Sequence, residues 1–275
     1  MDRFTLLAPA LALLAVFTTA FVVYCALCLA GRAPKIADVK HNQFFGLFFA
    51  RFLLWVIGPV ERLLVGRVSP NMITTVSLLL CAGTGVAAAV GRLDLAIWMY
   101  VVAGILDVLD GRLARLGNQQ TPAGALFDSV SDRWGELFVF GGYAWYLHET
   151  PWMLAVLLAI AGSMMVSYTR ARAEGLGLDA SGGVMQRAER IVLVAAGTLL
   201  AAWYDATAIL GGTMLLCGAA SCATALNRWV GATRQLARRS AEVIAEPVVE
   251  PEPAPIYTAI AAPPKKLRES AELAL

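Results

Sequence analysis

Four aspartates with regular spacing interrupt an apolar part of the chain. Asp107 and Asp110 are three residues apart and Asp128 and Asp132 four apart, so on helices each pair lies on one face. A charged side chain inside a membrane-length apolar segment costs about 2.5 to 3.5 kcal/mol on insertion scales, so acids of one sign need a compensating partner. Carboxylate oxygens are the ligands that hard divalent cations prefer. The pattern predicts a two-cation site able to hold a pyrophosphate.

The residues between the aspartates support this interpretation. Gly111 and Gly124 remove side chains where backbone or ligand must approach closely, and Arg112 and Arg115 are expected to add positive charge on the same rim. An ion-conducting or proton-relay constellation of a transporter is the alternative explanation for carboxylates in a membrane. That alternative does not account for glycine and arginine at set intervals.

The elements that position these residues are predicted to be membrane helices. Of the chain, 59% is hydrophobic and only 15% is charged, which indicates an integral membrane protein. The stretch 6–30 is predicted to be a membrane span that is retained, not a cleaved signal peptide, because it is long and no clear positive n-region precedes it. Residues 41–68 are predicted to form an amphipathic helix that lies in the membrane interface. Six further spans are predicted at 72–90, 95–113, 125–147, 152–171, 191–203 with an arginine-rich entry, and 208–230.

The predicted fold is therefore an all-α polytopic membrane helix bundle with six core transmembrane helices, one extra N-terminal span and an interfacial amphipathic helix. The parts are the extra span at 1–31, a basic segment with the interfacial helix at 32–68, the six-helix domain at 69–236, and a proline-rich, disordered cytoplasmic tail at 237–275. Lys and Arg gather in alternate connections, which places the N-terminus outside and the C-terminus inside. The aspartates then lie at the cytosolic face of the cytoplasmic membrane.

The run from Asp107 to Asp132 resembles the signature of the CDP-alcohol phosphotransferase family. The pattern DxxDGxxAR, eight residues and GxxxDxxxD is reproduced at every position by Asp107, Asp110, Gly111, Ala114, Arg115, Gly124, Asp128 and Asp132. The resemblance covers about 69–236. It implies two divalent cations, magnesium with manganese as the alternative, bound by the four aspartates. It also implies that Asp132 is the catalytic base.

The same resemblance implies where the nucleotide lipid binds. The CDP moiety of CDP-diacylglycerol is assigned to Met72, Ile73, Thr74, Thr75, Gly111, Arg115 and Thr121. An acceptor hydroxyl would attack the phosphorus that bears the lipid and expel CMP. The resemblance further implies a homodimer in the lipid bilayer, and no nucleic-acid partner is expected.

A second cluster bears on the acceptor. At the inner ends of the last three spans lie Ser167, Arg170, Arg172, Arg187, Arg190 and Arg228. Arginine binds phosphate with a planar fork of donors, so the acceptor is expected to carry phosphate. The segments SYTRARAE and QRAER resemble those of phosphatidylinositol-phosphate synthases of actinobacteria and archaea. That resemblance implies an acceptor-phosphate site of Ser167, Arg170, Arg190 and Arg228, with Arg170 in place of a lysine and Gln186 in place of a glutamate.

The sequence thus predicts transfer of a phosphatidyl group from CDP-diacylglycerol to inositol phosphate. Glycerol 3-phosphate is the alternative acceptor, since the same arginines could hold it. A non-catalytic membrane protein that binds lipid or ions is the alternative from a different class.

Overall fold

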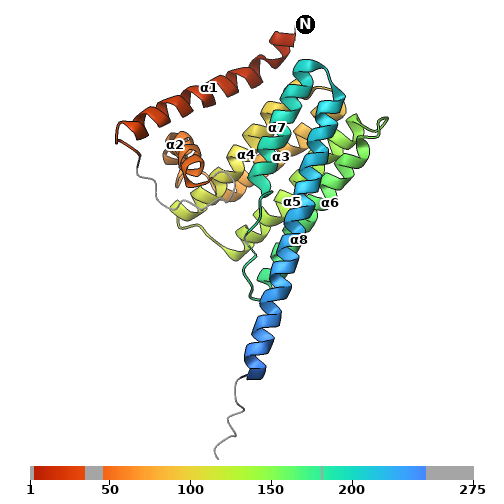
Figure 1. Cartoon of the computed structure of the whole chain (residues 1–275). Coiled ribbons are helices and arrows are strands. Elements are labelled where there is room, and N and C mark those ends of the chain that lie inside the picture. The colour runs from red at the N-terminus through yellow and green to blue at the C-terminus, as the bar shows by residue number, and fades with distance from the viewer. Residues whose placement is uncertain (1–2, 35–45, 181, 246–275) are drawn as a thin grey trace, which may run out of the picture. The chain divides into compact units, whose positions relative to one another are not determined.

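The regular elements of the chain are all helices in the part that the structure describes. The computed structural model describes residues 3–34, 46–180 and 182–245, and within these ranges it has eight helices (Figure 1). They are α1 (Arg3–Leu29), α2 (Gly46–Leu64), α3 (Pro70–Ala89), α4 (Leu93–Leu116), α5 (Pro122–Tyr146), α6 (Met153–Glu174), α7 (Arg187–Tyr204) and α8 (Thr207–Ala245). The predicted all-α bundle of six core helices, an N-terminal helix and an amphipathic helix is confirmed.

Two of the core helices begin with the same local signal. Ser69 accepts a hydrogen bond from the backbone N–H of Met72 at 3.3 Å, and Thr121 accepts one from Gly124 at 3.0 Å. A proline follows each cap, at the position where its fixed φ suits a first helical turn. A Cβ added to Gly124 would lie 3.4 Å from Oδ1 of Asn71, so the starts of α3 and α5 are neighbours.

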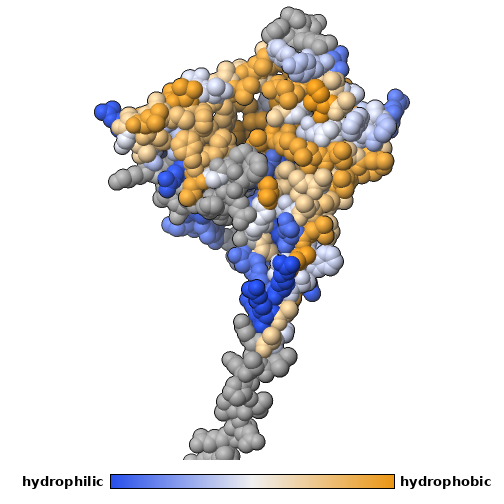
Figure 2. Space-filling model, in the orientation of Figure 1, coloured by the Kyte–Doolittle hydropathy of each residue, from blue (hydrophilic) through white to orange (hydrophobic). Residues whose placement is uncertain are grey.

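The helices α3 to α8 share one apolar core. Each contributes a fully buried side chain to it, namely Ala88, Ala96, Tyr143, Val156, Val194 and Met214. Apolar side chains also cover much of the face drawn in Figure 2. On the outside of these helices Leu79, Leu154 and Leu216 are more than half exposed. Large apolar side chains on the outside as well as the inside indicate a bundle surrounded by lipid.

Membrane-spanning character is strongest in four helices of the described chain. By length and hydropathy α1, α3, α6 and α8 could each cross a bilayer. The remaining core helices α4, α5 and α7 have the aspartates and arginines of the two clusters near their ends, which lowers their hydropathy. The protein is therefore a multi-pass membrane protein.

The helices α1 and α2 lie outside this core. Leu7 and Ala10 of α1 pack against Ile97, while Phe21 further along α1 contacts Phe52 of α2 with ring centroids 5.1 Å apart. The amphipathic α2 is tied to α4 by Glu61, whose two oxygens accept hydrogen bonds from Arg112 at 2.8 and 2.9 Å. Arg112 is 7% exposed. The expectation that it adds charge to the rim is wrong, because its fork neutralises a buried carboxylate.

The last helix runs further than the sequence indicated. Contacts divide the chain into a unit of residues 1–234 and a unit of residues 235–275, and α8 continues to Ala245. Residues 237–245 are thus helical rather than disordered, because they favour helix and the first proline of the tail comes only at 247. The rest of the predicted tail, and the basic segment from 35 to 45, lie outside the described residues.

The backbones of α3 and α5 touch near the C-terminal ends of both helices. A Cβ added to Gly142 would lie less than 3.0 Å from backbone atoms of Gly85, so neither helix has room for a side chain there. At Gly141, one residue earlier, an added Cβ meets no atom within 4 Å. This contact fixes the distance between the two helices whose first turns are neighbours.

We expect Gly142→Ala to destabilise the protein by about 1 to 3 kcal/mol, because the added methyl group forces the two helices apart. Gly141→Ala is the matched control and should leave stability unchanged or slightly higher, since alanine favours helix. Unfolding of both variants in detergent micelles, followed by circular dichroism, measures the difference. Equal stability of the two variants would show that the close contact is not required.

Candidate active site

The motif residues meet at one end of the bundle, where α4 ends and α5 begins. Asp107 and Asp110 lie in the last three turns of α4, and Asp128 and Asp132 lie in the first three turns of α5. The connection between these helices is short, so the chain turns back directly. The first residue of α7, Arg187, reaches the same place.

Three of the four aspartates form a compact cluster. One carboxylate oxygen from each of Asp107, Asp128 and Asp132 lies within 4.8 Å of the other two, and all three side chains are half-buried. Carboxylate oxygens at this spacing suit a hard divalent cation that accepts several oxygen ligands. The donor set therefore fits the cation that the sequence predicts.

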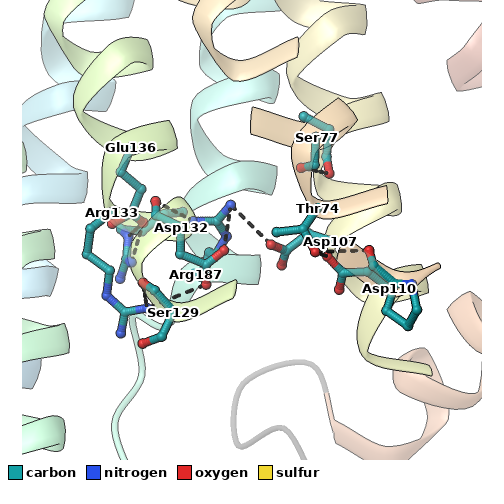
Figure 3. Close-up of polar contacts among 12 residues, drawn as sticks. Thr74, Ser77, Asp107, Asp110, Ser129, Asp132, Arg133, Glu136 and Arg187 are labelled. Atoms are coloured by element: carbon teal, nitrogen blue, oxygen red, sulfur yellow. Dashed lines mark hydrogen bonds and ion pairs between the residues drawn. The ribbon is translucent and has the colours of Figure 1, made fainter. Parts of the chain in front are cut away.

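The guanidinium of Arg187 lies between two of these carboxylates (Figure 3). Its Nη2 is 3.1 Å from Oδ1 of Asp107 and 3.2 Å from Oδ1 of Asp132, and its Nη1 donates to the backbone carbonyl of Asp132 at 2.7 Å. A second cation, Arg133, stands 3.6 Å from the other oxygen of Asp132. Both carboxylates thus share one positive group supplied from a third helix.

Asp110 has a different environment from the other three aspartates. It is 3% exposed, and its Oδ2 accepts a hydrogen bond of 2.6 Å from Oγ1 of Thr74 on α3 (Figure 3). It is not one of the three residues of the compact cluster. Its role as a metal ligand stays a prediction, and its contact with Thr74 joins the motif to the segment assigned to the CDP moiety.

The residues assigned to the CDP moiety surround this end of the bundle. On α3, Met72 and Thr75 are exposed, whereas Ile73 and Thr74 are buried. Thr121 is the exposed cap of α5. A Cβ at Gly111 would lie 3.5 Å from Nη1 of the half-buried Arg115. These residues come from three helix ends next to the aspartates, where the starts of two helices also favour an anion.

Two residues assigned to the acceptor phosphate are buried and have protein partners. Nε and Nη2 of Arg190 donate to Oε1 of Glu136, and Nη1 donates to the carbonyl of Met185 at 3.0 Å. Nε of Arg228 donates to the carbonyl of Gly182 and Nη1 to that of Val166, both at 2.7 Å. Arg190 and Arg228 are 2% and 6% exposed.

The other two residues of the acceptor cluster are more accessible. Ser167 is half-buried near the end of α6, next in sequence to the Val166 carbonyl that Arg228 contacts. Arg170 is exposed and pairs with Glu174 at 2.7 Å one turn along the helix. Arg190 contacts the carbonyl of Met185, whose N–H donates to Thr224 one turn before Arg228, and Arg228 contacts the carbonyl next to Ser167. These contacts connect the ends of α6, α7 and α8 at the acceptor cluster.

Several contacts of the site were not predicted. The sequence placed Arg187 among the acceptor arginines, yet its nearest carboxylates belong to the motif. Glu136 was not singled out from the sequence; it lies one helical turn beyond Asp132 on α5, and this spacing is the signal that could have found it. The partner of Asp110 on α3 gave no signal, because the two residues are 36 positions apart in sequence.

Residues 67–233 match the family described as CDP-alcohol phosphatidyltransferase. The chain is 33% identical over 138 residues to the phosphatidylinositol phosphate synthase of Mycobacteroides abscessus, a match that covers 49% of this chain and 61% of that protein. It is also 33% identical over 166 residues to the archaetidylinositol phosphate synthase of Methanothermobacter thermautotrophicus, covering 60% of this chain and 80% of that protein. The chain thus covers less than two thirds of the length of the Mycobacteroides abscessus protein.

Solved structures are similar over the same region. The phosphatidylinositol phosphate synthase of Mycobacterium tuberculosis with CDP-DAG bound has a TM-score of 0.59 and 27% identity, over 65% of this chain and 94% of that one. Its complex with manganese and citrate has a TM-score of 0.58, also with 27% identity, over 63% of this chain and 87% of that one.

Replacing Glu136 tests the buried ion pair. Glu136→Ala leaves the guanidinium of Arg190 buried without its carboxylate, so we expect a loss of about 3 to 5 kcal/mol of stability. Arg170→Gln breaks an exposed pair instead and should cost less than about 1 kcal/mol. Chemical unfolding in detergent measures both, and a small effect at Glu136 would contradict the structural role assigned to the pair.

Proposed function

Because the chain belongs to the CDP-alcohol phosphatidyltransferase family, we propose that it transfers a phosphatidyl group from CDP-diacylglycerol to inositol phosphate and releases CMP. The observation that supports this most directly is the cluster of Asp107, Asp128 and Asp132 at the meeting point of two helices. Two relatives named as inositol phosphate lipid synthases add to it, as does a similar structure solved with CDP-DAG.

The aspartates have separate tasks in the proposed reaction. Asp107, Asp128 and Asp132, with Asp110 behind them, would hold divalent cations, which when bound neutralise the pyrophosphate and stabilise the leaving CMP. Asp132 would accept the proton of the acceptor hydroxyl. The freed oxygen electron pair would form a bond to the phosphorus that bears the diacylglycerol, and the bond from that phosphorus to the oxygen of CMP would break. No covalent intermediate with the protein is needed.

The donor and the acceptor would approach from different helices. The CDP moiety would lie against the first turns of α3 and α5, between Thr74, Gly111 and Thr121. The acceptor phosphate would lie beside Ser167 and Arg170, which are accessible. Arg228 would add positive charge from behind, because hydrogen bonds to two carbonyls hold it in place. The charge of Arg190 is balanced by Glu136, so Arg190 would contribute to the position of this side of the site more than to its net charge.

The orientation in the membrane follows from the distribution of basic residues. We propose that the site faces the cytosol across the inner membrane, with the N-terminus outside and the C-terminus inside, because the connection 175–186 and the end of α8 are flanked by arginines. Helices α6, α7 and α8 place Arg170, Arg187 and Arg228 on the same side as the aspartates. A homodimer is part of the same proposal and rests on the family resemblance alone.

An assay with purified protein tests the acceptor. We expect CMP release from CDP-diacylglycerol with inositol phosphate in the presence of magnesium or manganese, and none after chelation by EDTA. Glycerol 3-phosphate is the comparison acceptor, because it carries a phosphate that the same arginines could hold. CMP release with glycerol 3-phosphate alone would refute the inositol assignment, and no release with any acceptor would favour a non-catalytic protein.

Asp132→Asn should lower the rate of CMP release by about 10²- to 10⁴-fold, because the amide cannot take the proton of the attacking hydroxyl. Asp205→Asn makes the same chemical change at the opposite end of the helices, beside a cavity of about 220 Å³, and should retain the wild-type rate. Thermal unfolding of both variants shows whether they fold. Turnover by Asp132→Asn at the wild-type rate would remove Asp132 as the base.

A further inference from the structure

Arg187 and a divalent cation would bind the same two carboxylates. Nη2 of Arg187 is within 3.2 Å of Oδ1 of both Asp107 and Asp132, and these aspartates are two of the three residues of the proposed cation site. A cation bound by the same carboxylates would stand close to the guanidinium, where like charges repel. The two positive groups therefore compete for this pair of carboxylates.

The contacts of Arg187 allow it to move. Its Nε is buried and has no hydrogen-bond partner among the described residues, so only part of its donor fork is used. Its side chain is 19% exposed, which leaves one side open. Gly135 borders the guanidinium from α5, where a Cβ would lie 3.9 Å from Nη2 but only 3.2 Å from Sγ of Cys81. The side chain can therefore move toward its exposed side rather than toward Gly135.

Arg190, one turn along α7, shows the contrasting case. Its Nε, Nη1 and Nη2 all donate to protein acceptors, and the residue is 2% exposed. Arg190 is thus held in place by Glu136, which is buried and is not expected to bind a cation. One helix presents two arginines to the site, of which one is fixed and one can be released.

We propose that Arg187 is a resident counter-cation of the aspartate cluster, which neutralises Asp107 and Asp132 until a divalent cation binds and then leaves them. The inference rests on the proposed function, because that function identifies the cluster as a cation site. Arg187 is a positioning residue in this role. It keeps the two carboxylates together at the end of an apolar bundle and sets how tightly the cation is held.

Binding of Mn²⁺ to the full-length protein in detergent, without any lipid or acceptor, tests the proposal. Arg187→Gln should bind Mn²⁺ about tenfold more tightly than the wild type, because a competing positive charge is removed. Arg133→Gln is the matched control. It removes a charge that stands 3.6 Å from Asp132 but does not bridge the carboxylates, so its affinity should change far less.

Thermal unfolding in EDTA and in Mn²⁺ gives a second readout. In EDTA the Arg187→Gln variant should unfold at a lower temperature than the wild type, and Mn²⁺ should raise its unfolding temperature by more. Arg187→Lys keeps the charge but lacks the fork, and its Mn²⁺ affinity should lie between the two. If Arg187→Gln does not fold, the Mn²⁺ affinity of Arg187→Lys decides the test. Unchanged or weaker Mn²⁺ binding by both Arg187 variants would overturn the proposal, and because no substrate is present the result is independent of whether the transferase activity is found.

Discussion

Carboxylates at the end of an apolar helix bundle lose hydration and repel one another, and this constraint organises much of the structure. Several acidic positions near the site are matched by a guanidinium from another helix. Glu61 of α2 faces Arg112 of α4, Glu136 of α5 faces Arg190 of α7, and Arg187 bridges α4 and α5 from α7. At these positions the contacts that neutralise charge also join the helices to one another.

Sequence patterns predicted the parts of the site whose residues are close in the chain. The spacing of Asp107 to Asp132 placed the acids on facing helix ends. Long-range pairs had no such signal. Arg112 looked like a rim charge because its partner Glu61 lies 51 residues away, and the partners Arg190 and Glu136 are 54 residues apart. Only the folded chain shows which arginines already pair with a carboxylate of the protein and which can bind a substrate.

The two ends of the helices have different character. At one end, capped helix starts, acids and arginines form a dense polar network that leaves few donors unused. At the other end, Asp94 and Asp205 border a cavity beside α1, and Arg92 forms two hydrogen bonds with Asp94 at 2.9 and 2.7 Å. The apolar core of alanine, valine and tyrosine side chains between them holds α3 to α8 in a constant relation. Chemistry is thus confined to a thin layer at one end, and the rest of the bundle serves to align it.

The backbones of α3 and α5 are in direct contact at Gly85 and Gly142. The segment between α6 and α7 contacts α8 through side chains instead: Thr224 accepts a hydrogen bond from the backbone N–H of Met185, and Arg228 donates one to the carbonyl of Gly182. Substitutions in that segment can alter one side of the site without disturbing the other. In the proposed reaction, the helices that would bind the nucleotide lipid are constrained by close backbone packing, whereas the segment that would meet the acceptor is constrained less. Changes in head-group preference could then arise by substitution in that segment while the aspartates stay the same.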